Sequence, residues 1–356
     1  MPSPIRAAIV GCGNIANRYA KQAKDYPAAV ELAGFFDLDA SRAQAFAEEF
    51  GGTAYPSLEA LLADDAVDLV VNLTIHHVHF KTTTQMLEAG KHVYSEKPLA
   101  LSADEAMKLV ALAEAKGVTL AGAPMNFLGD AQQKTWKLIR DGAIGTPRLV
   151  YAEVNHGRIE TWHPNPEPFY DVGPLWDVGV YPLTLATTFF GPVTRVVAAH
   201  QTVVYPNRTT KEGRDFTIEA PELTIAVLEI GEIVVRLTTN FFVHSKNSHQ
   251  GPRFEVHGET GSVVLGNFQN NDALVEHSAF NEDLAGEPWP EGTPGPQQFG
   301  RGLNEVCVAL QEGRRPRVTG KQAAHVVEVL DTIAAVAKSH TPTAIKSTFD
   351  AVEPSL

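Results

Sequence analysis

Residues 5–20 read IRAAIVGCGNIANRYA, an apolar run that is interrupted by two glycines and then resumes with helical spacing. We interpret this stretch as a strand, a tight turn and the start of a helix. Gly11 can adopt a backbone conformation that residues with a Cβ resist, Gly13 leaves room for a ligand against the main chain, and Ala16 allows the helix to pack closely on the strand. The N–H groups at the start of that helix suit a pyrophosphate. Because a G-x-G-x-x-A turn also occurs as a plain strand-to-helix connection, the surrounding sequence has to decide between the two readings.

The composition of the 356-residue chain is that of a globular protein with enough length for two separate cores. Its net charge of −13 disfavours nucleic acid and anionic membranes as partners, so a small molecule is expected instead. Cys12 and Cys307 lie far apart in the sequence, which excludes a disulfide framework and a thiolate metal cluster. The cysteine usage, the lack of a signal-peptide pattern after Met1 and the lack of a membrane-spanning apolar run predict a cytoplasmic protein.

Strand and helix patterns alternate along the first third of the chain. The predicted strands cover residues 5–10, 30–36, 53–55, 67–73, 92–95 and 118–121. A first helix follows the glycine turn and ends near Tyr26, and further helices are predicted at 40–50, 58–63, 78–89 and 102–116. Ser57 and Ser102 precede two of these helices as expected caps. The alternation predicts an α/β fold with a doubly wound parallel sheet, a Rossmann domain over residues 1–124.

The pattern changes after Pro124, and residues 125–356 are predicted to form a second, α+β domain. Long strand patterns occur at 148–155, 193–204, 223–230, 232–243 and 254–265, several of them joined by hairpin-like turns, and helices are expected at 130–140, 299–311 and 321–338. Residues 281–296 are rich in Gly, Pro and acidic residues and are expected to form a surface loop. The second domain is therefore predicted to contain a large, mostly antiparallel sheet.

Asp37 ends the second predicted strand, where a carboxylate can accept hydrogen bonds from both ribose hydroxyls of an adenosine and would repel a 2′-phosphate. NAD is therefore the predicted cofactor, with NADP less favoured. The alternative is that Asp37, together with Asp39, caps the next helix. Arg42 could turn toward a phosphate, which would favour NADP.

The run Asn72-Leu73-Thr74-Ile75-His76-His77-Val78-His79 follows the fourth predicted strand, at the sheet edge where open α/β folds bind ligands. Its three histidines raise the question of a metal site. Since no acid or thiol occurs nearby at ligand spacing, helix capping and cofactor contact are the favoured roles, and no metal is predicted.

Glu96-Lys97-Pro98 follows the next strand and reaches the same sheet edge, since the proline favours an extended Lys97. Beside a positively charged nicotinamide ring and partly dehydrated, the ammonium group of Lys97 would lose its proton more readily, which fits proton transfer. The alternative is a solvated turn lysine beside a glutamate.

Asp177 and Tyr181 are four residues apart in a predicted helical segment, so they share one helix face and could point at one substrate. A phenol with an unperturbed pKa near ~10 needs a neighbouring cation to act at neutral pH, and Lys97 could be that cation. The alternative is that Asp177 caps the helix and Tyr181 is packing. Upstream, residues 160–166 (ETWHPNP) form either a sugar-binding wall that includes His163 or a structural loop.

Together these residues resemble the glucose-fructose oxidoreductase, inositol dehydrogenase and MocA family of pyridine-nucleotide enzymes, with motifs from Ile5 to the last helices. The glycine turn and Glu96-Lys97-Pro98 match the family's signatures. Residues 74–79 (TIHHVH) replace the proline and asparagine of its T-P-N-x-x-H motif. In residues 173–184, Asp177 and Gly179 match, while Tyr181 stands where many members have histidine. The resemblance to the branches with tyrosine there implies an acid-base role for Tyr181.

The resemblance implies an NAD(P)-dependent oxidoreductase that transfers hydride between nicotinamide and a secondary hydroxyl or carbonyl of a sugar, cyclitol or related polyol. The residues predicted to bind the cofactor are Gly11, Gly13, Asn14, Ile15, Asp37, Thr74, His76, His79, Glu96 and Lys97. The residues predicted to bind substrate are Lys97, Asn126, His163, Asp177 and Tyr181, of which Lys97, Asp177 and Tyr181 are the predicted catalytic set.

Two alternative functions are left open by the sequence. One is an enzyme that uses bound NAD transiently, oxidising a sugar, eliminating a substituent and reducing the product again. The other is a dinucleotide-binding regulator without catalysis, against which the presence of Lys97 and Asp177 argues. By analogy with the family, whose sheets often pack against a symmetry mate, a homodimer or homotetramer is expected.

Overall fold

The computed structural model describes residues 2–243, 251–293 and 295–354. Along these residues the chain divides into two units. The first comprises Met1–Met125 and Gln298–Val327, and the second comprises Asn126–Gln297 and Glu328–Leu356.

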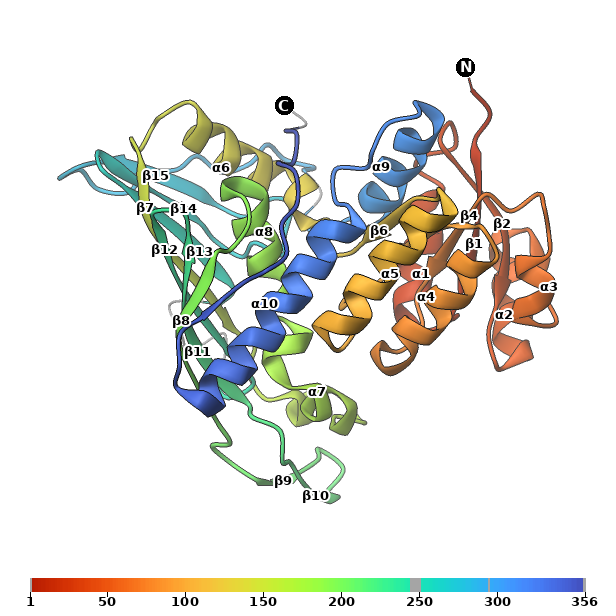
Figure 1. The fold of residues 1–356 in the computed structure, drawn as a ribbon, viewed down its shortest axis with the longest axis horizontal. Helices are drawn as coiled ribbons and strands as arrows, with labels where there is room; N and C mark the ends of the chain where they lie inside the picture. Colours follow the sequence, from red (N-terminus) through yellow and green to blue (C-terminus); the bar gives the residue numbers. More distant parts are fainter. Residues whose placement is uncertain (1, 244–250, 294, 355–356) are drawn as a thin grey trace. The chain divides into compact units, whose positions relative to one another are not determined.

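The first unit is built on a six-stranded sheet in the order β3-β2-β1-β4-β5-β6 (Figure 1), in which every neighbouring pair is parallel. Its strands are β1 (Ile5–Val10), β2 (Val30–Phe36), β3 (Thr53–Ala54), β4 (Leu69–Asn72), β5 (His92–Ser95) and β6 (Leu120–Gly122). All four residues of β4 are fully buried, as expected for a central strand with both faces covered. The predicted doubly wound parallel sheet is confirmed.

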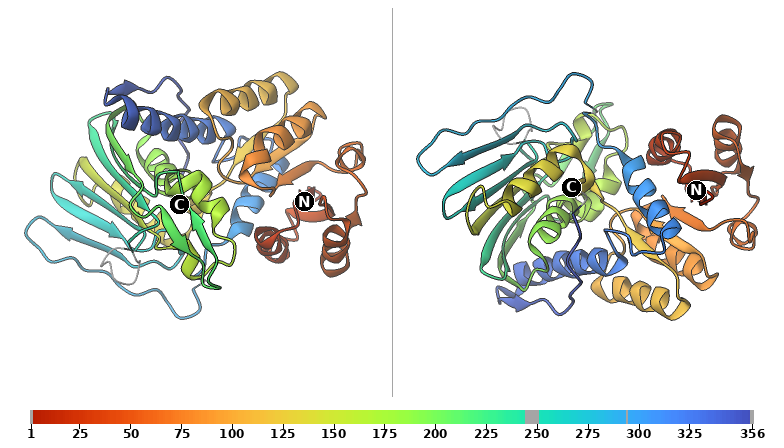
Figure 2. Two further views of the ribbon diagram at one scale, coloured as in Figure 1. Left: turned by 90° about the horizontal axis from the view of Figure 1, so that it is seen from below. Right: turned by 90° about the horizontal axis from the view of Figure 1, so that it is seen from above.

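Helices flank both faces of this sheet (Figure 2). They are α1 (Asn14–Ala23), α2 (Ala40–Phe50), α3 (Leu58–Leu62), α4 (His79–Glu88), α5 (Ala103–Lys116) and α9 (Phe299–Gln311). The expected caps are confirmed, since the hydroxyl of Ser57 accepts from the N–H of Ala60 at 3.1 Å and that of Ser102 from the N–H of Glu105 at 3.3 Å. Helix α1 ends at Ala23, one turn before the predicted end near Tyr26.

Helix α9 and the start of α10 (Gly320–Ser339) belong to the first unit, whereas the sequence places them in the second domain. The reason is packing: α9 contacts α1, and the ring of Phe299 lies 5.3 Å from that of Tyr19. A Cβ on Gly122 of β6 would approach that of Ala323 in α10 to 2.6 Å. A simple cut at residue 124 cannot describe a chain that returns to its first sheet.

The second unit contains an eight-stranded sheet in the order β15-β14-β13-β7-β12-β11-β8-β16. Its strands are β7 (Pro147–Asn155), β8 (Arg195–Thr202), β11 (Leu223–Ile230), β12 (Ile233–Asn240), β13 (Arg253–Gly258), β14 (Gly261–Leu265), β15 (Val275–Ala279) and β16 (Thr343–Ala344). All neighbouring pairs are antiparallel except β7 and β12. The mostly antiparallel sheet is therefore confirmed, with one parallel pair that makes it mixed.

The helical elements of the second unit are η2 (Asn126–Leu128), α6 (Asp130–Arg140), η3 (Ile159–Thr161), α7 (Glu167–Asp177) and α8 (Val180–Phe190), followed later by the second part of α10. Within this unit, α6 contacts β14 and β15, α7 contacts β11 and β12, and α8 contacts β7. These three helices therefore pack against the sheet.

A two-stranded sheet of β9 (Asn207–Thr209) and β10 (Asp215–Thr217) is absent from the sequence-based expectations, as are β15 and β16. Its strands, NRT and DFT, are too short and polar to carry an alternating pattern. The expected surface loop at 281–296 is largely exposed, with one bridge from Ala285 to His277, and residue 294 lies outside the described residues. In the described part of the chain, no helix has the length and apolar character needed to cross a bilayer.

Candidate functional site

The register of the first sheet brings four strand ends to one edge. Val10 pairs with both Phe36 and Asn72, and Asn72 pairs with Ser95. The residues that follow these strands therefore leave the sheet together at its carboxyl edge, where open α/β folds bind ligands. They include four residues predicted to bind a cofactor: Gly11, Asp37, Thr74 and Glu96.

The glycine turn requires its two glycines for different reasons. Gly11 has φ +94°, and a Cβ there would lie 2.7 Å from the carbonyl oxygen of Leu73. Gly13 has φ −89° and caps α1 without a side chain, and a Cβ added to it would meet no heavy atom within 4 Å. Gly11 is therefore needed by the fold itself, while the space beside Gly13, next to the start of α1, suits the pyrophosphate of a dinucleotide.

We expect Gly11→Ala to destabilise the protein by about 1–3 kcal/mol, because it combines a positive φ with a backbone clash. Gly13→Ala is the matched variant, since its φ is open to alanine. It is expected to leave the melting temperature unchanged and to weaken dinucleotide binding at least tenfold. Thermal unfolding and a fluorescence titration with the nicotinamide cofactor measure the two effects. Equal melting temperatures for the two variants would contradict the assignment.

Asp37 holds the glycine turn from the neighbouring strand end. Its carboxylate accepts from the N–H of Cys12 at 2.7 Å and from that of Asp39 at 2.9 Å. Asp39, rather than Asp37, caps α2 by accepting from the N–H of Ser41, and it lies 3.5 Å from the guanidinium of Arg42. The two acids therefore have separate structural tasks. Burial, followed by the charge of Asp37, raises the pKa of Cys12 to about 12, so its thiol stays protonated.

Asn72 and His79 shape the next segment of the edge. The buried amide of Asn72 accepts from the hydroxyl of Thr74 at 2.7 Å. The ring nitrogens of His79 lie 2.7 Å from the carbonyl of Pro98 (Nδ1) and 2.9 Å from that of Thr74 (Nε2). Burial lowers the pKa of His79, although both carbonyls favour the protonated ring.

His79 is 1% exposed and both of its ring nitrogens contact main-chain carbonyls, so it ties the Thr74 segment to the residue after Lys97. Its contact with a cofactor stays a prediction. His76 and His77 form the 3-10 turn η1 (His76–Val78), with ring centroids 4.1 Å apart. Among the described residues, no group of three or more His, Cys, Asp or Glu side chains could hold a metal ion.

Glu96 fixes the main chain at Lys97. One carboxylate oxygen accepts from the phenol of Tyr19 at 2.7 Å, and the other accepts from the N–H of Lys97 at 3.1 Å. Burial and then the charge of Glu96 raise the pKa of Tyr19 well above its ordinary value, so the phenol remains a donor. Lys97 itself is half-buried at the carboxyl edge. Sequence reasoning missed Tyr19, because this residue lies far from Glu96 in the sequence and belongs to no recognisable motif.

In the second unit, Asp177 and Tyr181 do not share one continuous helix as predicted. Helix α7 ends at Asp177 and α8 begins at Val180, with Gly179 between them. A Cβ on Gly179 would lie 2.4 Å from the carbonyl oxygen of Leu175, so a larger residue does not fit there. Asp177 is half-buried, and Tyr181, in the first turn of α8, is 9% exposed. The two residues therefore lie on either side of a helix boundary.

Asn126 is the most ligand-like of the predicted substrate residues. Its side chain is 5% exposed, yet neither its amide nitrogen nor its amide oxygen has a hydrogen-bond partner among the described residues. An unpaired buried amide is costly, so a polar ligand group is the expected partner. It lies in η2, which packs against α8, the helix of Tyr181.

His163 lies in an aromatic loop on the same unit. Its Nδ1 accepts from the N–H of Asn165 at 3.1 Å, and its ring is 4.9 Å from Phe169 and 5.4 Å from the exposed Trp162. The loop is thus held by its own contacts, and the substrate-binding role of His163 stays a prediction.

Comparison with known proteins extends this picture. A family model described as an oxidoreductase family with an NAD-binding Rossmann fold matches residues 5–123, and the model of the GFO/IDH/MocA C-terminal domain matches residues 133–264. A dTDP-3,4-didehydro-2,6-dideoxy-alpha-D-glucose 3-reductase from Actinomadura kijaniata is 31% identical over 93% of this chain and 95% of its own length.

Two solved structures share the fold. A 3-ketoreductase from Actinomadura kijaniata in complex with NADP superposes with a TM-score of 0.73 at 23% identity, covering 94% of this chain and 97% of its own. An oxidoreductase domain protein from Kribbella flavida reaches a TM-score of 0.83 at 20% identity, covering 97% and 100%. The likeness spans both units.

Proposed function

Because the chain belongs to the GFO/IDH/MocA family of oxidoreductases, we propose that it interconverts a secondary hydroxyl and a carbonyl group of a sugar, cyclitol or related polyol. The observation that carries this proposal is the common sheet edge, which joins the glycine turn, Asp37 and the clamped Lys97 in one unit. The dTDP-sugar named for one relative favours a sugar over a non-carbohydrate alcohol.

In this proposal a nicotinamide dinucleotide would supply or accept the hydride when bound. The protein's own groups bind and orient the substrate and move its proton. Tyr181 exchanges the proton of the substrate oxygen, while Lys97 and Asp177 support it electrostatically. Asn126 and His163 bind substrate hydroxyls. The turn at Gly11, Gly13, Asn14 and Ile15 holds the pyrophosphate, Asp37 the ribose, and Thr74, His76 and Glu96 line the nicotinamide half.

The test is a panel of sugars, cyclitols and their keto derivatives, with NAD and NADP in both directions. Net change of nicotinamide absorbance with at least one member is expected. Product formation without such a change would favour the transient oxidation and elimination instead, and dinucleotide binding without any turnover would favour the regulator.

For the cofactor we propose NAD, because a ribose-binding carboxylate at Asp37 repels a 2′-phosphate. The relative solved with NADP and the nearby Arg42 make the comparison necessary. We expect Asp37→Asn to lower kcat/KM for NAD by about tenfold or more, since hydrogen bonds to charged groups contribute about 1.5–3 kcal/mol. Asp37→Asn should also lower the ratio of kcat/KM for NAD to kcat/KM for NADP.

Asparagine keeps one acceptor oxygen, for the N–H of Cys12, and loses the acceptor for the N–H of Asp39, so a somewhat lower melting temperature is expected and the kinetics are measured well below it. Arg42→Ala is the companion variant and should leave NAD kinetics unaltered. A wild-type preference for NADP that Arg42→Ala abolishes would overturn the choice of NAD. The cytoplasmic location and the homodimer or homotetramer stay predictions that belong to this proposal.

A further inference from the structure

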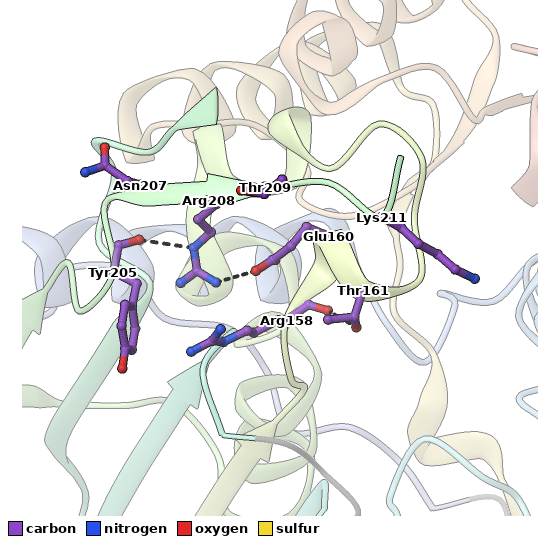
Figure 3. A pocket seen from close by; sticks show the side chains of 8 residues that line it. All are labelled: Arg158, Glu160, Thr161, Tyr205, Asn207, Arg208, Thr209 and Lys211. Atoms are coloured by element: carbon purple, nitrogen blue, oxygen red, sulfur yellow. Dashed lines mark hydrogen bonds and ion pairs between the residues drawn. The ribbon is translucent and has the colours of Figure 1, made fainter. Parts of the chain in front are cut away.

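A cavity of about 530 Å³ opens within the second unit, apart from the residues assigned above (Figure 3). Two segments line it, one at the start of η3 and one around β9. Its lining residues are Arg158, Glu160, Thr161, Tyr205, Asn207, Arg208, Thr209 and Lys211. Three cations against one carboxylate are unusual on a chain with a net charge of −13. The cavity therefore differs electrostatically from the protein as a whole.

Arg208 builds the wall of this cavity. Its guanidinium donates to Glu160 at 2.7 Å, to Glu222, and to the carbonyl of Tyr205 at 3.1 Å, and only 1% of its side chain is exposed. Figure 3 shows it at the centre, joined to Glu160 and Tyr205. Two buried carboxylates offset its charge. Arg208 is therefore a structural group and has little left to offer a ligand.

Arg158 and Lys211 differ from Arg208 in that neither has a carboxylate partner in the described ranges. The guanidinium of Arg158 lies 4.7 Å from the centre of the Tyr205 ring and 5.8 Å from that of Phe242, which stack on each other. Stacking holds the guanidinium plane while its N–H edge stays available to an oxyanion. Lys211 is exposed and adds a second positive charge, and Figure 3 shows its side chain extended away from Arg158. Asn207, at the start of β9, adds a neutral amide to the lining on the opposite side of Arg208 from Lys211.

The cavity is continuous in sequence with the predicted substrate residues. Arg158 and Thr161 lead directly into Trp162 and His163. Glu160 accepts from the phenol of Tyr170 in α7, the helix that ends at Asp177. Burial, followed by the hydrogen bond to Glu160, raises the pKa of Tyr170 well above its ordinary value, so this donor is permanent. One stretch of chain therefore connects the cationic cavity to the predicted catalytic Asp177.

We propose that this cavity binds a phosphoryl group carried by the sugar substrate, as a phosphate monoester or a diphosphate. Two separate cations and a neutral donor suit the several oxygens and near-double charge of a phosphoryl group better than a carboxylate. The assignment of the ligand to the substrate rests on the proposed oxidoreductase function, whereas the oxyanion site itself does not.

The test uses the full chain saturated with its nicotinamide dinucleotide, so that the glycine turn cannot bind the probe. Calorimetric titration with inorganic pyrophosphate at fixed low ionic strength is expected to show binding to the wild type and at least tenfold weaker binding to Arg158→Met combined with Lys211→Met. Lys338→Met removes an exposed cation elsewhere in the second unit and should bind like the wild type. Lys211→Met alone serves if the double variant does not fold.

A kinetic arm compares each sugar with its phosphorylated form. The double variant should raise KM for the phosphorylated sugar alone and leave kcat unchanged. Three results would overturn the proposal: no binding of pyrophosphate by the wild type, equal affinity of the wild type for pyrophosphate and acetate, or binding of pyrophosphate by the double variant as tight as that by the wild type. If no sugar is turned over, the proposed function fails while the titration still decides the site.

Discussion

Replacing Lys97 by methionine is expected to lower kcat/KM for a verified substrate by about 10²–10⁴-fold, the usual contribution of a positioned proton-transfer group. The main chain at Lys97 is fixed by Glu96, which Tyr19 holds in turn, so the ammonium group is presented from a rigid base. Methionine keeps the unbranched stem and removes only the charge. The melting temperature should therefore stay near that of the wild type, and a cofactor titration shows how far Lys97 also contributes to cofactor binding, as predicted.

Tyr181→Phe tests the same step from the second unit and is expected to give a loss of similar size. Phenylalanine keeps the ring of a side chain that is 9% exposed and removes only the hydroxyl. If Lys97 and Tyr181 act together on the same step, the double variant should be no slower than the slower single variant. The rate losses of residues that act on one step are not additive. Multiplied losses would show that the two residues act on separate steps.

The control is Lys81→Met, which removes an exposed lysine from α4 of the first unit. It should leave kcat/KM unchanged. If Lys81→Met also stopped turnover, the effect of Lys97→Met would come from the loss of a positive charge and not from the position of Lys97. Unchanged turnover in both Lys97→Met and Tyr181→Phe would remove these residues from the reaction.

The first unit could be predicted closely because its signals are local. Apolar runs of strand length, caps such as Ser57 and Ser102, and the paired glycines each act within a few residues, and the parallel alternation then restricts the topology. The sequence cannot show which side chains hold the edge. Tyr19 and His79 act through partners on other segments, and only the folded register brings those partners within hydrogen-bond distance.

The second unit was less predictable because its organisation depends on distant pairs. The parallel pairing of β7 with β12 and the return of α9 to the first sheet leave no local pattern. The break between α7 and α8 was missed, although Gly179 stands there and Gly173, with φ +73°, interrupts α7 just upstream. Only the folded chain singles out Asn126, because its amide is buried and has no hydrogen-bond partner among the residues that the structure describes.

Arg208→Met is expected to lower the free energy of unfolding of the second unit by about 3–5 kcal/mol, the typical effect of removing one partner from a buried ion pair. The substitution leaves Glu160 and Glu222 as uncompensated carboxylates, and Glu222 is fully buried. Urea denaturation of the full chain measures the loss. The penalty arises from stranded charge, so Arg208→Met combined with Glu222→Gln should recover part of it.

Arg195→Met is the matched control for Arg208→Met, because Arg195 also pairs with a carboxylate, Glu229, but half of its side chain is exposed. Exposed pairs contribute about 0–1 kcal/mol, so this variant should unfold close to the wild type. Equal losses for the two arginines would mean that the burial of Arg208 has no energetic weight. We expect a large loss of stability for Arg208→Met alone, and pyrophosphate binding by the fraction of this variant that is folded. These two results would show that Arg208 stabilises the wall of the cavity, whereas Arg158 and Lys211 bind the ligand.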